Sequence, residues 1–219
     1  MTKPASRTTD LPTRLNVGCG RDVRGDWVNL DHVRQQGMDR FDIVGDICEP
    51  PTVAVWDQGH RMVRPHDFEK HFTEMELCHV IEHLPDVLVA MDNLYIMAAT
   101  GCVMTVRCPH GASDDADEDP THVRRMFPSS FLTFGQPYYW RSDYGYRGDW
   151  VLDEVVCKVS PYLASLKAET PQAWADLAHK HAQAGRNMVL EMTATLKANR
   201  PGRKPRQELM EELRVAYQP

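Results

Sequence analysis

The 219-residue sequence lacks the features that mark several specialised classes of protein. No apolar run approaches the length of a membrane span, and residues 1–12 have no apolar core of signal-peptide length. The net charge of −6 does not favour the wrapping of long nucleic acid, which depends on clustered lysine and arginine. We therefore expect a cytoplasmic protein that contacts no membrane and does not bind long nucleic acid as its main task.

Cysteine pairs with the spacing of metal or redox sites are also lacking. The six cysteines include no C-x-x-C pair, and most of them lie in apolar runs or at their ends. A free cysteine in such a position behaves as a small buried apolar residue. We therefore expect reduced thiols and no disulfide framework.

The most informative stretch that is present covers residues 14–31, RLNVGCGRDVRGDWVNLD. A short apolar run stops at Gly18-Cys19-Gly20, and a second run ends on Asp31. This pattern predicts a strand, a glycine turn where backbone can approach a ligand, and a neighbouring strand that presents a carboxylate. The arrangement suits a nucleoside, because an acid can accept hydrogen bonds from ribose hydroxyls.

Strand and helix patterns alternate along the rest of the chain, which predicts an α/β fold. The sheet should be mostly parallel with helices on both faces, and ligands should bind at the carboxyl ends of the strands. Pro85 is placed to begin a helix that Gly101 ends, and Thr170 and Gly185 are placed to begin and end a second helix. Further strands are expected at residues 39–46, 75–81, 102–108, 150–159 and 188–198.

Three segments differ in composition. Residues 1–12 are predicted to be a flexible leader, residues 13–199 the main domain, and residues 200–219 a solvated basic hinge followed by a terminal helix. Within the main domain, residues 110–150 contain nine of the eighteen aromatic residues. This segment is expected to be an insertion, either a lid over the substrate or a small core of its own.

The residues at the predicted strand ends resemble those of the class I S-adenosylmethionine-dependent methyltransferases, in particular the small bacterial and phage-type members. The resemblance spans roughly residues 14–135 and implies a Rossmann-like methyltransferase fold. It also implies S-adenosylmethionine as the cofactor and S-adenosylhomocysteine as the product. The matching segments are LNVGCG (15–20), WVNLD (27–31), DIVGDI (42–47), CHVIEHL (78–84) and, more loosely, DPTHVRRMFPSSF (119–131).

The same resemblance implies roles for individual residues. The glycine turn would face the methionine portion of the cofactor, Asp31 the ribose and Asp46 with Ile47 the adenine. His79 and Val80 would flank the methyl donor. The predicted cofactor-binding residues are Val17, Gly18, Cys19, Gly20, Arg21, Asp31, Asp46, Ile47, His79 and Val80.

Only six residues, Arg21 to Asp26, separate the glycine turn from the next strand. A parallel crossover usually takes a dozen or more residues, so the first helix should be a single turn or absent. A dinucleotide site would need a third glycine where Val23 stands, and its acid about 20 residues on. An NAD-dependent oxidoreductase is therefore a minor alternative. The other alternative is a non-catalytic protein that binds an adenosyl ligand or acts as an interaction module.

Four histidines, His79, His83, His110 and His122, are candidate general bases, because imidazole titrates near neutrality. His122 is the preferred catalytic residue, with His79 and His83 beside it. Residues 79–83 also match the H-x-x-E-H pattern of some zinc peptidases, but that pattern needs a helix and this one starts on a strand end. We therefore predict no metal. A divalent ion held by His110, His122 and nearby acids is an alternative.

The sequence does not identify the methyl acceptor. Methyl transfer from a sulfonium is a direct displacement, so the protein mainly aligns the reactants and removes a proton where needed. A covalent route through cysteine is not expected, because Cys78 lies within a strand and Cys108 precedes a proline instead of following one. The acidic loop at residues 114–119 repels polyanions, which favours a small-molecule or nucleotide-like substrate.

Overall fold

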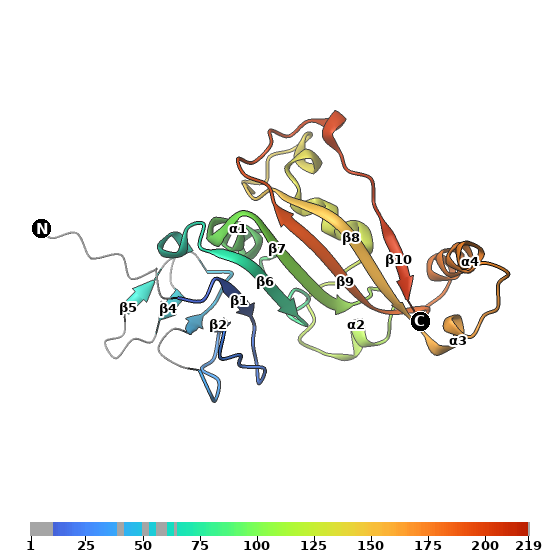
Figure 1. Cartoon of the computed structure of the whole chain (residues 1–219), viewed down its shortest axis with the longest axis horizontal. Coiled ribbons are helices and arrows are strands. Elements are labelled where there is room, and N and C mark those ends of the chain that lie inside the picture. The colour runs from blue at the N-terminus through green and yellow to red at the C-terminus, as the bar shows by residue number, and fades with distance from the viewer. Residues whose placement is uncertain (1–10, 39–41, 50–52, 56–60, 64, 219) are drawn as a thin grey trace, which may run out of the picture.

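The computed structural model describes residues 11–38, 42–49, 53–55, 61–63 and 65–218. Ten strands form one sheet in the order β10-β8-β9-β7-β6-β1-β2-β3-β4-β5 (Figure 1). The strands are β1 (Arg14–Val17), β2 (Val28–Asp31), β3 (Ile43–Gly45), β4 (Val53–Val55), β5 (Arg61–Val63), β6 (Phe72–Cys78), β7 (Ala98–Pro109), β8 (Trp150–Val159), β9 (Val189–Ala198) and β10 (Val215–Gln218). The helices are η2 (Pro65–Phe68), α1 (Val87–Met97), α2 (Asp115–Glu118), η3 (Pro128–Phe134), η4 (Gln136–Tyr139), α3 (Pro161–Ala164), α4 (Pro171–Ala184) and η5 (Gln207–Leu209).

Five neighbouring strands, β3-β2-β1-β6-β7, are parallel. Their order is that of a Rossmann-like sheet. Successive strands are added on one side of β1 as far as β3, and the next parallel strand, β6, is then added on the other side of β1. The switch point therefore lies between β1 and β6. Strand β9 then enters antiparallel between β7 and β8. The strand order and directions therefore confirm the prediction of a Rossmann-like α/β fold. Ligands of such sheets bind at the carboxyl ends of the strands beside the switch point.

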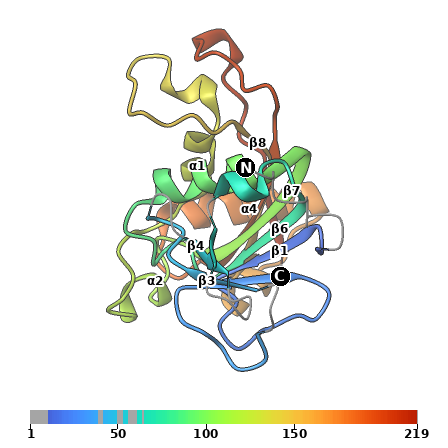
Figure 2. The same ribbon diagram turned by 90° about the vertical axis from the view of Figure 1, so that its left-hand side faces the viewer.

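One face of the sheet is apolar across the strands from β3 to β9. Apolar residues pair with apolar residues of the neighbouring strands on this face: Leu15 pairs with Val28 and with Met75, and Val106 pairs with Ala194. These side chains are buried in a single core. Helix α1 packs on this face, as the edge-on view in Figure 2 shows. Asp86 caps its first turn by accepting a hydrogen bond from the Val89 amide.

The opposite face is polar, and in the described residues the links from β1 to β2 and from β2 to β3 contain no helix. The loop after β1 instead binds this face through hydrogen bonds: Asn16 Nδ2 donates to the Asp22 carbonyl, and the Arg24 amide donates to Asn29 Oδ1. Buried Asp42 accepts from the Asn29 amide at 2.7 Å. The prediction that the first helix is short or absent is therefore confirmed. The prediction of helices on both faces of the sheet is wrong for these two links, because a polar face does not need an apolar helix to cover it.

Several aromatic side chains of residues 110–150 contribute to the core of the domain. Phe131, Phe134, Tyr146 and Trp150 are buried in it, and Trp150 Nε1 donates to the Met91 carbonyl of α1 at 3.2 Å. These four side chains therefore join the main core and do not form a small core of their own. Whether the more exposed part of the segment covers a substrate stays a prediction.

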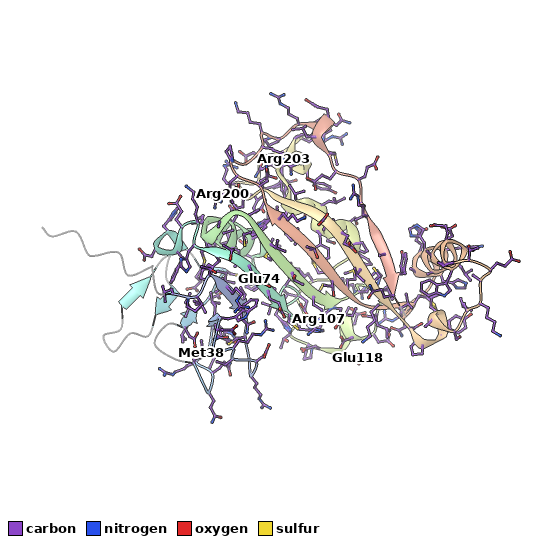
Figure 3. The ribbon with its side chains drawn as sticks, viewed as in Figure 1. Met38, Glu74, Arg107, Glu118, Arg200 and Arg203 are labelled. Atoms are coloured by element: carbon purple, nitrogen blue, oxygen red, sulfur yellow. The ribbon has the colours of Figure 1, made fainter. Side chains whose placement is uncertain are left out.

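The C-terminal segment differs from its prediction. Instead of a terminal helix, residues 215–218 form β10, which pairs parallel to β8 and covers that edge of the sheet. The basic hinge is mostly exposed, as predicted, but two of its arginines bind to the rest of the domain. Arg200 donates to the Tyr95 and Ile96 carbonyls at the end of α1, and Arg203 pairs with fully buried Asp149 at 2.8 Å (Figure 3). Both arginines are held by partners too distant in sequence for a local pattern to reveal.

The other local predictions agree with the structure to within a few residues. Helix α4 begins after Thr170, whose hydroxyl accepts from the Ala173 amide, and ends at Gly185. Helix α1 ends at Met97, before Gly101, which instead lies inside β7 with a positive φ of 75°. Residues 1–10 of the predicted leader and residues 39–41 of the third predicted strand lie outside the described residues. None of the helices in the described ranges is long and apolar enough to cross a membrane.

Candidate functional site at the carboxyl ends of β1, β2 and β6

The glycine turn after β1 packs directly on the segment that follows β6. Gly18 has a φ of 62°, and a Cβ at this position would lie 2.4 Å from Val80 Cγ2. Only glycine fits both the backbone conformation and the space. The structure thus joins two predicted cofactor-binding residues from opposite sides of the switch point.

Gly20 and Asp31 are also joined. The Gly20 amide donates to Asp31 Oδ2 at 2.8 Å, and the Val33 amide donates to Oδ1 at 3.0 Å. Oδ1 also lies 3.3 Å from His32 Nδ1, whereas Oδ2 has a further lone pair to offer to a ligand. A Cβ on Gly20 would meet nothing within 4 Å, so there is open space over the turn. An adenosyl ligand can approach the backbone there.

Cys19 lies in the middle of this turn and is buried. Burial raises the pKa of its thiol to about 12, and the charges of Asp31 and Asp42 act in the same direction. A thiol held protonated is a poor nucleophile. This environment disfavours Cys19 as a nucleophile, and all six cysteines of the chain are free.

The remaining predicted cofactor residues lie along the same edge. Val17 is buried at the end of β1, and Arg21 is exposed just beyond the turn. Asp46 follows β3, which pairs with β2, and its Oδ1 accepts from the Cys48 amide at 2.8 Å. Ile47 is buried, and its carbonyl accepts from Asn93 of α1 at 2.8 Å. The contacts of Asp46 and Ile47 with an adenine stay a prediction.

His79 directly follows β6 in the left-handed backbone region, with a φ of 54°. A non-glycine residue in this conformation is held there by its surroundings. Its amide donates to the Arg107 carbonyl at 2.8 Å. Its ring lies between two carboxylates, with Nε2 2.9 Å from Glu191 Oε2 and Nδ1 3.4 Å from Glu82 Oε1.

Glu82 is the functional candidate that the sequence analysis missed. It is 2% exposed, and neither carboxylate oxygen has a hydrogen-bond partner among the described residues. Burial raises the pKa of this carboxyl, while the nearby His79, His83 and His122 oppose that shift. Glu82 belongs to the H-x-x-E-H pattern of residues 79–83, but the role of the pattern depends on a residue that is distant in the sequence.

That distant residue is His122. The His83 and His122 rings lie 4.6 Å apart, and the Val123 amide donates to the Glu82 carbonyl at 2.9 Å. One potential ligand atom from each of Glu82, His83 and His122 lies within 4.8 Å of the others. The structure therefore brings all three predicted catalytic histidines, His79, His83 and His122, around one buried carboxylate.

His110 is not part of this group. Burial lowers the pKa of its imidazole, and its ring packs edge-on against Phe127 at 5.3 Å. It lines a separate cavity of about 590 Å³ between the end of β7, α4 and β10. In the described part of the chain, the three-residue group that could hold a cation contains His122 but not His110. The alternative that joined these two histidines around an ion therefore lacks support.

Comparisons with known proteins give similarities of fold. No family model matches the sequence, and no curated protein matches it. Among solved structures, a SAM-dependent methyltransferase from Archaeoglobus fulgidus is 14% identical, with 86% of each chain covered and a TM-score of 0.48. The YcgJ protein from Bacillus subtilis is 11% identical, with 90% of this chain and 97% of that chain covered and a TM-score of 0.49. The [4+2]-cyclase SpnF is 12% identical, with 87% and 77% covered and a TM-score of 0.48.

Proposed function

We propose that this protein is an S-adenosylmethionine-dependent methyltransferase. The observation that carries the proposal is the contact, at the switch point, between the glycine turn after β1 and the segment after β6. The turn through Gly18 and Gly20 leaves backbone open to a ligand, while Asp31 offers a carboxylate oxygen on the next strand. Ligands of open α/β sheets bind in this position.

The absence of a helix after β1 narrows the choice of ligand. A dinucleotide site uses a helix N-terminus to bind pyrophosphate, and the described link from β1 to β2 has none. A sulfonium cofactor carries no phosphate, so its binding does not need a helix N-terminus at this position. This supports an adenosyl ligand over NAD, the minor alternative.

S-adenosylmethionine supplies an activated methyl group when bound. The residues of this chain would then position the acceptor, exclude water and accept a proton where the nucleophile carries one. His79 directly precedes Val80, which contacts the glycine turn, and the His83 ring follows in the same segment and lies 4.6 Å from the His122 ring. These three histidines are therefore the candidates for proton transfer. We propose a small or nucleotide-like acceptor, since the acidic residues before His122 disfavour a polyanion.

Calorimetry with S-adenosylhomocysteine tests this proposal directly. The full chain should bind one equivalent, and Asp31→Ala should weaken binding by at least about tenfold, because a charge-assisted hydrogen bond contributes roughly 1.5–3 kcal/mol. Asp153→Asn is the matched control, since Asp153 is a half-exposed acid that pairs with Lys197. Circular dichroism of each variant verifies the fold.

The outcomes separate the two classes of function. No binding of S-adenosylhomocysteine at millimolar concentration by folded protein would rule out the proposal. Binding without transfer of labelled methyl to any pool of metabolites, nucleotides or cell extract would instead identify a non-catalytic adenosyl-binding protein. Transfer to one of these pools would identify the acceptor class.

A further inference from the structure

The Glu82 carboxyl group is buried, and no described residue forms a hydrogen bond with it. Both carboxylate oxygens are inaccessible to solvent and without a hydrogen-bond partner in the described ranges. Leaving a buried carboxylate in this state is costly, because its hydration is lost and nothing replaces it. The carboxylate faces His83 and His122, with one potential ligand atom of each residue within 4.8 Å of the others.

The hydrogen bonds of His83 fix which ring nitrogen is free. Thr121 Oγ1 donates its proton to Asp119 Oδ1 at 2.6 Å. The same hydroxyl lies 2.9 Å from His83 Nδ1, so Nδ1 must be the donor in that contact. Hydrogen bonds from His83 to Thr121 and from Thr121 to the Asp119 carboxylate therefore keep the proton of the neutral His83 ring on Nδ1. Its Nε2 keeps a lone pair in the neutral ring.

His122 is fixed in the same way by a different partner. Its Nδ1 lies 3.3 Å from the Ala116 carbonyl, which can only accept a hydrogen bond. The proton is therefore on Nδ1, and Nε2, which lies 3.9 Å from Asp119 Oδ2, keeps the lone pair in the neutral ring. Two histidines with carbonyl or hydroxyl partners on Nδ1 and unprotonated Nε2 atoms are the usual arrangement of metal-binding histidines.

The backbone around the three residues is anchored. The His83 amide donates to the Val80 carbonyl at 3.0 Å, and the His122 amide donates to the Asp119 carbonyl at 3.1 Å. The Val123 amide binds the Glu82 carbonyl at 2.9 Å and so joins the two segments. The group is therefore organised in advance by contacts that need no ligand.

We propose that Glu82, His83 and His122 bind one divalent transition-metal ion, for which zinc is the reference ligand. Two imidazoles and one carboxylate form a donor set that zinc, cobalt and similar ions favour, whereas magnesium and calcium prefer oxygen ligands alone. Three protein ligands leave a coordination position open for water or for a substrate atom. The inference departs from the prediction of no metal, and it does not rest on methyl transfer.

The competing explanation is that protonated histidines neutralise Glu82 without any metal. His79 could serve, since its Nδ1 lies 3.4 Å from Glu82 Oε1. The two explanations differ in what added metal does. An imidazolium–carboxylate cluster gains nothing from zinc, whereas a metal site gains stability in proportion to occupancy.

The test loads the chelator-treated full chain with zinc and measures binding by calorimetry and thermal stability by melting. We expect one equivalent of zinc per chain and a melting temperature that rises with zinc concentration. Glu82→Gln and His122→Gln should each weaken zinc binding by more than about 100-fold, and Thr121→Val by about 10- to 100-fold. His66→Gln, at an exposed histidine of η2, is the matched control and should bind as wild type does.

Two further measurements keep the proposal falsifiable if a variant is unstable. Cobalt added in place of zinc should give visible absorption bands that the Glu82→Gln variant does not give. In the presence of chelator, Glu82→Gln should melt no lower than wild type, since its amide replaces a desolvated charge. No zinc binding by folded wild type, or equal binding by wild type and the Glu82→Gln and His122→Gln variants, would overturn the metal site.

Discussion

Gly18 and Gly20 occupy one turn, yet they differ in what surrounds them. Both have positive φ angles, 62° and 49°, but a Cβ on Gly18 would collide with Val80 while a Cβ on Gly20 would meet nothing within 4 Å. The requirement for glycine at position 18 is therefore both conformational and steric. At position 20 it is conformational only.

This difference gives a prediction for two alanine variants. Gly20→Ala should lower the free energy of unfolding by about 1–2 kcal/mol, the cost of an L-residue in the left-handed region. Gly18→Ala should lower it by more than that, because the side chain of Val80 must also move. Denaturant unfolding measures both, and a second change, Val80→Ala, should recover part of the Gly18→Ala loss. Equal losses in the two single variants would contradict the steric argument.

A second residue-scale prediction concerns Asp149, whose side chain is completely buried. Burial by itself disfavours its charge, but hydrogen bonds from Arg203, Asn199 and the Gln136 amide hold the pKa of this carboxyl below its usual value. A lowered pKa stabilises the fold above the unfolded value of about 3.9, and this stability is lost as pH falls through the folded pKa.

Asp149→Asn should therefore lower the free energy of unfolding at pH 7 by roughly 1.5–3 kcal/mol, since it removes the buried one of the two carboxylates, Asp149 and Glu211, that pair with Arg203. The variant should also lose less stability than wild type as the pH falls below about 4. Denaturant titrations across this pH range measure both effects. Asp153→Asn is the control at a half-exposed acid, and a wild-type acid response in Asp149→Asn would refute the assignment.

At the scale of elements, local signals predicted what local interactions decide. Thr170 and Gly185 mark the ends of α4 through contacts within a few residues, as predicted, whereas α1 begins at Val87 after its cap Asp86, two residues beyond Pro85. The prediction of a terminal helix was wrong because β8 presents an unpaired strand edge, and this edge exists only once the sheet has folded. A pattern compatible with a helix formed a strand instead, since β10 satisfies that edge.

Removal of residues 210–219 should therefore affect more than the tail itself. The Leu152 amide would lose its partner Glu211 at 3.1 Å, and the Val155 amide would lose the Arg214 carbonyl at 2.9 Å. We expect a lower melting temperature and concentration-dependent aggregation through the exposed edge of β8. Light scattering during heating measures this. Ala216→Ser, at an exposed position of β10, is the control, and a truncated chain that stays monodisperse would contradict the prediction.

The sequence predicted the part of the candidate site that lies at the strand ends, but not the part that Glu82 and His122 form. The strand ends that carry Gly18, Asp31 and His79 follow from runs of apolar residues and the residues that stop them. The pairing of Glu82 with His122 depends on how the chain folds back after α2, which no short pattern encodes. The H-x-x-E-H motif was therefore visible, but its third ligand was not.

At the scale of the whole molecule, the alternation of side chains along the strands decides the layers. Strands β1, β2, β6 and β7 direct apolar residues to one face and polar residues to the other. The polar face includes Glu74 and Arg107, which are exposed on β6 and β7 (Figure 3). The prediction of two helical layers came from the fold class, whereas the residues themselves indicate one.

A sheet that is covered by apolar packing on one face alone has a consequence for the thermodynamics of unfolding. The heat capacity of unfolding grows with the apolar surface that unfolding exposes, and polar exposure reduces it. An average chain of 219 residues would show about 3 kcal/mol/K. We expect calorimetry to give a smaller value and denaturant titrations a correspondingly shallow m-value, because charged residues of the polar face such as Glu74, Arg107 and Lys197 are already exposed to water when the protein is folded. A heat capacity at or above the average would mean that the polar face is covered in solution. The shallow dependence on temperature would give a broad stability curve, so that the protein keeps its fold over a wide range of cold as well as warm conditions.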